Sequence, residues 1–139
     1  MTVWTARGSR LDIEVAVALE IATLRLKSAE RQCERQDALA YSAQLWRIIS
    51  RFASMAPVGE LGERLMASAD IIAGSIDPDV FVRHNTAHAQ MLGGRAATNG
   101  ALRRLLDDWN RHRGATMGAD FASWILDRLD DRVASLSFG

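Results

Sequence analysis

Two histidines, His84 and His88, stand one helical turn apart, a spacing that lets both imidazoles reach one metal ion. A tetrahedral site needs further ligands, and no glutamate lies between the two histidines as a zinc protease requires. The third histidine, His112, falls in a different predicted helix. We therefore expect a partly exposed polar helix face without a metal at these positions, with zinc coordination as the alternative.

Two pairs of carboxylates have the same spacing, Glu30 with Glu34 and Asp127 with Asp131. Helical di-iron sites use paired acids in this way, but they gather them from several helices and include Glu-x-x-His motifs. The sequence shows neither feature, and both pairs lie in heavily charged stretches. We predict that these carboxylates form solvated helix faces.

The one cysteine, Cys33, has no partner for an internal disulfide, which indicates a reducing compartment. It lies next to Glu34 and Arg35, and the sequence shows no base partner that would convert its thiol to a nucleophilic thiolate. The glycine pair at 93–94 follows no predicted strand and matches no phosphate-binding loop. No catalytic set is complete, so we expect a protein that is not an enzyme and holds no cofactor.

The charges balance to a formal net charge of +0, which argues against overall attraction to nucleic acid or anionic lipid. The densest basic patch, residues 103–113, contains Asp107 and Asp108 at helical spacing from its arginines, which neutralises it from within. No apolar run reaches the roughly 20 residues that span a bilayer, and residues 1–9 lack a signal core. We expect a cytoplasmic protein that binds neither nucleic acid nor membrane.

Helix-capping residues separate stretches whose apolar side chains recur at helical spacing. Ser9, Asp37, Asp77 and Asn99 occupy the cap positions, and no segment alternates at the period of a strand. The predicted helices span residues 10–35, 38–56, 60–76, 78–92, 100–113 and 120–135. The sequence thus predicts an all-α fold, a compact bundle of five or six helices with short loops.

Three segments follow from this punctuation. Residues 1–8 form an N-terminal arm, residues 9–113 the helical bundle, and residues 114–139 a C-terminal helix that packs on the bundle or extends it. The polar stretch 27–37 is either the protruding end of the first helix or the break before the second.

Tryptophan and arginine dominate the energetics of protein interfaces, so the tryptophans are the candidates for partner contact. Trp4 lies in the N-terminal arm, and Trp46 adjoins Arg47 on the second predicted helix. We predict that Trp4, Leu45, Trp46 and Arg47 bind a partner, while packing in the core is the alternative for Trp46.

The stretch 30–47 resembles the FlaF family of small cytoplasmic proteins tied to flagellin production and export. The features shared over about residues 10–95 are a long first helix, a polar break, and a helix that bears the pair Leu45-Trp46. The resemblance implies a chaperone or regulator of an exported protein, with flagellin as the client.

The first hypothesis is therefore a non-enzymatic helical binding module that shelters an amphipathic helix of another protein. A structural protein that associates with itself as a homodimer is the second hypothesis. A metal-dependent enzyme built on the carboxylates or on His84 and His88 is the third.

Overall fold

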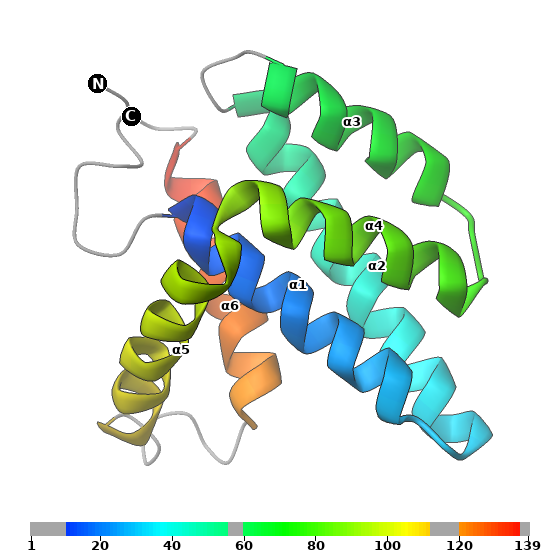
Figure 1. Cartoon of the computed structure of the whole chain (residues 1–139), viewed down its shortest axis with the longest axis horizontal. Helices are drawn as coiled ribbons and strands as arrows, with labels where there is room; N and C mark the ends of the chain where they lie inside the picture. Colours follow the sequence, from blue (N-terminus) through cyan, green and yellow to red (C-terminus); the bar gives the residue numbers. More distant parts are fainter. Residues whose placement is uncertain (1–10, 56–59, 112–119, 137–139) are drawn as a thin grey trace.

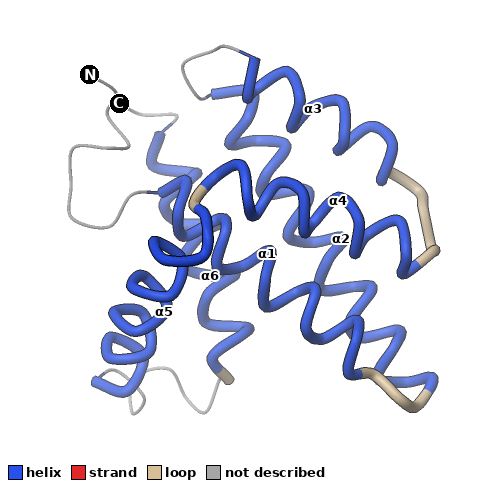
Figure 2. The backbone as a smooth tube through the Cα atoms, viewed as in Figure 1, coloured by secondary structure: helices blue, strands red, loops and turns tan. Residues whose placement is uncertain are grey.

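The computed structural model describes residues 11–55, 60–111 and 120–136, and the chain forms six helices within them (Figure 1). They are α1 (Leu11–Ser28), α2 (Gln32–Met55), α3 (Glu60–Ile72), α4 (Pro78–Leu92), α5 (Gly94–Arg111) and α6 (Phe121–Leu136). The described part contains no strand (Figure 2), so the predicted all-α bundle is confirmed. None of the described helices is long and apolar enough to cross a membrane.

Helix α1 is the centre of the bundle, with contacts to α2, α4, α5 and α6 (Figure 1). Its sequence is apolar around most of the circumference, the pattern of a helix that is buried on several sides. Helix α3 lies at the periphery and packs mainly on α2. The fully buried large side chains come from every one of the six helices, among them Leu19, Ile49, Leu65, Phe81, Leu105 and Leu129.

The boundary between α1 and α2 lies earlier than predicted. Helix α1 ends at Ser28, whose hydroxyl donates to the carbonyl of Leu24, and the break covers residues 29–31. Glu34 then accepts a hydrogen bond from the backbone N–H of Arg31 at 3.0 Å, which is the reciprocal half of a capping box. The polar stretch therefore begins α2, and the prediction of Asp37 as its cap is wrong.

The junction between α3 and α4 is largely as predicted. Asp77 accepts a hydrogen bond from the backbone N–H of Asp79, and Pro78 occupies the first turn of α4. Helix α3, however, ends at Ile72 because Gly74 adopts a φ of 81°, a left-handed conformation that favours glycine. Ile76, the last residue of the helix predicted over residues 60–76, lies outside α3 and is 84% exposed.

Helix α5 begins at Gly94 and not at residue 100, so Asn99 lies inside the helix and does not cap it. Only a turn at Gly93 separates α4 from α5. A Cβ atom at Gly93 would lie 3.1 Å from the Thr98 hydroxyl and 3.4 Å from the Ala16 methyl of α1. The absence of a side chain at Gly93 allows the two helices to meet closely over α1.

Helix α6 packs on α1, α2 and α5 and buries Ile125, Leu129 and Val133. Asp120 precedes it and accepts a hydrogen bond from the backbone N–H of Ser123 at 2.8 Å, which lowers the pKa of the Asp120 carboxyl. The arm 1–8, the predicted cap Ser9 and the first part of the C-terminal segment, residues 114–119, lie outside the described residues.

Candidate partner-binding groove and the polar cluster behind it

A groove of about 720 Å³ runs over the outer face of α2, between the C-terminal half of α3 and α6. We call it the α2 groove. The α2 positions Ala43, Arg47 and Arg51 recur every four residues along it, which corresponds to a length of about 12 Å. The groove can therefore hold roughly two turns of a helix.

The floor of the α2 groove is aliphatic and made of small or branched side chains, namely Ala43, Ile48, Ala69, Ile72 and Ala73. Small side chains allow a bound segment to approach the helices closely. Charged side chains stand around this floor. Arg51 of α2 forms an ion pair with Asp130 of α6, while Arg47 and Asp70 have no ion partner among the described residues.

The residues predicted to bind a partner divide into three groups. Arg47 is exposed and lines the α2 groove, as a partner contact requires. Leu45 is fully buried and Trp46 is 3% exposed, because both face the inside of the bundle. As they stand, these two side chains pack within the chain and offer almost no surface to a partner. Trp4 lies outside the described residues.

Trp46 joins the floor of the groove to a polar cluster between α2, α3 and α4. Its indole N–H donates to Asn85 Oδ1 at 2.7 Å, and its ring meets the ring of His88 edge to face at 5.5 Å between centroids. The hydroxyl of Ser68 lies 2.7 Å from His88 Nε2 and 3.0 Å from His84 Nδ1. One hydroxyl of α3 therefore bridges the two imidazoles of α4.

The pKa of both histidines in this cluster is lowered, which favours the neutral imidazole. Burial lowers the pKa of His88, and repulsion from His84 when that ring is protonated and from Arg64 lowers it further. Burial also lowers the pKa of His84, with Arg83 as the second cause. If both rings were protonated, the Ser68 oxygen would have to accept from two cations, and its own proton would lose its acceptor.

The spacing of His84 and His88 correctly indicated that the two rings share a face. The expectation that this face is partly exposed is wrong for His88, which is 4% exposed because its ring packs against Trp46 and Ser68. Among the described residues, no three side chains of the histidine, cysteine, aspartate and glutamate types converge on a point where a metal ion would fit. Glu30, Glu34, Asp127 and Asp131 are all exposed, which fits the predicted solvated faces. Cys33 is exposed and free, and His112 lies outside the described residues.

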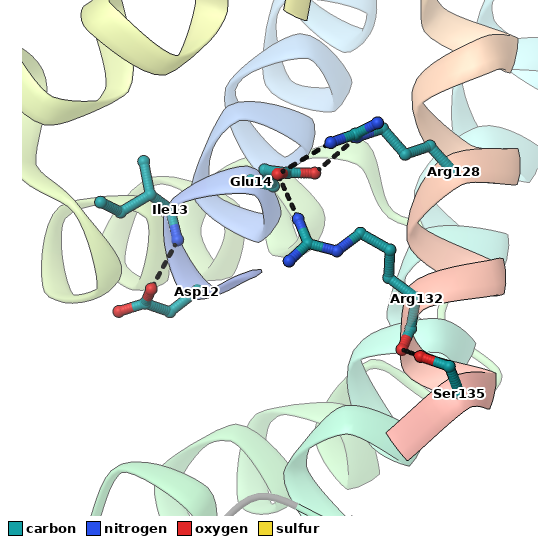
Figure 3. Close-up of polar contacts among 6 residues, drawn as sticks. All are labelled: Asp12, Ile13, Glu14, Arg128, Arg132 and Ser135. Carbon is teal, nitrogen blue, oxygen red and sulfur yellow. Dashed lines mark hydrogen bonds and ion pairs between the residues drawn. The ribbon is translucent and has the colours of Figure 1, made fainter. Parts of the chain in front are cut away.

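A second polar cluster holds α6, which forms the side of the α2 groove opposite α3. Glu14 of α1 is 1% exposed and accepts hydrogen bonds from Arg128 Nε at 2.8 Å and from Arg132, both of α6 (Figure 3). The hydrogen bond to Glu14 raises the pKa of the Arg128 guanidinium. These bonds hold α6 against α1 and so help to position Asp130 beside α2.

Glu14, Ser68 and Asn85 are members of buried clusters that were not predicted from the sequence. The feature of the sequence that could have indicated them is a polar residue within an apolar stripe of a helix. Glu14 stands between Leu11 and Ala18, and Ser68 between Leu65 and Ile72. Such residues are buried only with a hydrogen-bonding partner, so their positions point to a polar contact but not to its identity.

No family model, no curated protein and no solved structure matches this chain. The resemblance to the FlaF family in residues 30–47 therefore stays a prediction.

Proposed function

We propose that this protein is a non-enzymatic binding module whose α2 groove holds an amphipathic helix of another protein. The observation that carries the proposal is the combination of an aliphatic floor with Arg47, a charge that no acidic side chain of the described residues neutralises. An apolar stripe of the bound helix lies on Ala43, Ala69 and Ala73, as in other helix-in-groove complexes.

Charge sets the direction and specificity of this binding. An acidic residue on the bound helix faces Arg47, and a basic residue across the stripe faces Asp70. The Arg51–Asp130 pair closes one end of the groove. At the other end, Ile76 follows the groove residue Ser75 and offers an exposed apolar side chain to the same partner.

The client that the resemblance implies is flagellin, and the wider class is exported proteins with exposed amphipathic helices. Such helices need shelter before export, because apolar stripes without a covering surface associate with one another. The proposed module covers that stripe in the cytoplasm.

The proposal is tested by site-specific cross-linking in the native host. A photo-reactive amino acid at position 73, in the floor of the groove, is expected to capture an exported protein through one of its helices. The same amino acid at position 103, exposed on α5, is the matched control. Arg47→Glu is expected to reduce the capture at position 73 at least tenfold, whereas Arg103→Glu leaves it unchanged.

The proposal fails if positions 73 and 103 capture the same proteins, or if capture at position 73 persists undiminished in the Arg47→Glu variant. Recovery of exported proteins other than flagellin would support the α2 groove as the binding site and exclude flagellin as the client.

A further inference from the structure

A second groove, of about 500 Å³, lies between α1 and α4 on a face that shares no lining residue with the α2 groove. The two helices run antiparallel, since Gly93 at the end of α4 adjoins Ala16 near the start of α1. The α1 wall consists of Glu20, Thr23, Leu24 and Lys27, and α4 contributes Thr86, Ala89 and Gln90. We call this surface the α1–α4 face.

Leu24 is an exception on its own helix. Ten residues of α1 are buried, yet Leu24 is 66% exposed in the middle of the α1–α4 face. Glu20 and Lys27 flank it at one turn on either side, and both are exposed. Neither charge forms an ion pair with another described residue.

The spacing of these charges suits one particular occupant. Glu20 and Lys27 are seven residues apart, so they lie on one stripe of the helix at a distance of about 10 Å along its axis. A second α1 that runs antiparallel across this stripe sets Glu20 against Lys27 of the other copy and Lys27 against its Glu20. A parallel copy would oppose like charges, which is unfavourable.

From this self-complementary pattern we propose that the α1–α4 face binds a second copy of this chain, as a two-fold symmetric dimer with antiparallel α1 helices. Each Leu24 enters the groove beside Thr86 and Ala89 of the other copy, where its side chain is shielded from solvent. A two-fold interface uses the same patch on both subunits, and each ion pair therefore forms twice. The α2 groove of each copy stays open.

The dimer is tested by sedimentation equilibrium of the full chain over a range of concentrations. The unchanged chain is expected to dimerise, and Leu24→Asp to remain a monomer. Glu20→Lys or Lys27→Glu alone creates two like-charge contacts and weakens dimerisation by about tenfold. The double variant E20K/K27E restores the pairs with their signs exchanged, so it dimerises like the unchanged chain.

A mixture of the two single variants gives the sharpest outcome. Glu20→Lys carries two basic residues and Lys27→Glu two acidic ones, so the mixture is expected to form heterodimers more readily than either variant forms homodimers. Glu63→Lys, the same charge change on the exposed face of α3, is the control and leaves dimerisation unaltered. Circular dichroism checks that each variant keeps its helix content.

A chain that stays monomeric at all concentrations overturns the proposal, and so does a dimer whose stability is the same in all of these variants. Neither result bears on the α2 groove, because cross-linking at position 73 reports on a separate surface.

Discussion

Two polar clusters connect the helices of this bundle, and they stabilise buried polar groups by different kinds of contact. Between α1 and α6, a buried carboxylate meets two guanidinium groups, so the contact depends on charge. Between α2, α3 and α4, neutral groups meet through a hydroxyl, two imidazoles, an amide and an indole. The first cluster needs its partners charged, whereas the second needs its histidines uncharged. We call the contact between α1 and α6 the charged seam and the contact between α2, α3 and α4 the neutral seam. The two seams are expected to respond differently to mutation and to pH.

The largest effect is expected from removal of the buried carboxylate. Glu14→Ala removes the buried carboxylate that accepts hydrogen bonds from Arg128 and Arg132, which lowers the free energy of unfolding by about 3 kcal/mol. Urea denaturation followed by circular dichroism measures it. Glu63→Ala, at an exposed position, is the control and changes the free energy by less than about 0.5 kcal/mol. A loss below about 1 kcal/mol for Glu14→Ala would show that the seam is no stronger than a surface ion pair.

Asn85→Ala is expected to be the most damaging single change in the neutral seam. It deprives the indole N–H of Trp46 of its acceptor and lowers the free energy of unfolding by about 1–3 kcal/mol. Asn99 is exposed inside α5, so Asn99→Ala, the same substitution, is the matched control. A double-mutant cycle with Trp46→Phe isolates the hydrogen bond, and strictly additive effects would mean that it contributes nothing.

Acid should weaken the neutral seam through His88. Its pKa is lowered in the folded protein, so the unfolded chain binds more protons once the pH falls below the ordinary value of 6.5. Stability is thus full above pH 6.5 and declines as the pH drops, by at most about 1.4 kcal/mol per pH unit for one histidine. Denaturation between pH 7 and pH 5 measures the slope.

His88→Gln is the comparison for this titration, because glutamine keeps a hydrogen-bonding side chain but does not titrate. The slope below pH 6.5 is expected to shrink in this variant. An unchanged slope would place the acid-sensitive group elsewhere in the molecule.

The smallest effect concerns the end of α3, which carries Ser68 into the neutral seam. Gly74→Ala forces an alanine into a left-handed conformation and lowers the free energy of unfolding by about 1 kcal/mol. Gly100→Ala has the opposite sign, because Gly100 lies inside α5 and a Cβ there makes only an ordinary contact at 3.8 Å. Thermal denaturation of the two variants measures the difference, and equal shifts would contradict the assignment.

The sequence predicted the start of α4, which depends on local chemistry, but not the start of α2, where the equally local contact of Glu34 with Arg31 was missed. Asp77 and Pro78 mark the start of α4 because an aspartate cap and a proline in the first turn act within a few residues. The start of α5 was predicted at residue 100 because Asn99 can cap a helix. The observed start at Gly94 involves the close approach of Gly93 to α1, which is a tertiary contact and leaves no local pattern.

The candidate sites show the same limit. The four-residue spacing of His84 and His88 correctly predicted a shared face, since that geometry is intrinsic to a helix. Their bridging partner, Ser68, comes from another helix, and the partners of Glu14 lie 114 and 118 residues away. Arg47 was identified as an exposed candidate, whereas the adjacent Trp46 proved to be buried, because one step along a helix turns a side chain by about 100°.

The wide separation of Glu14 from its arginines has a consequence for the newly made chain. Protein synthesis proceeds from the N-terminus, so a nascent polypeptide that includes only α1 to α5 lacks the two arginines that Glu14 contacts in the finished bundle. The bundle becomes complete only after the ribosome has released α6. Truncated chains that lack α6 never acquire the arginine partners of Glu14, so we expect them to be unstable and to be degraded.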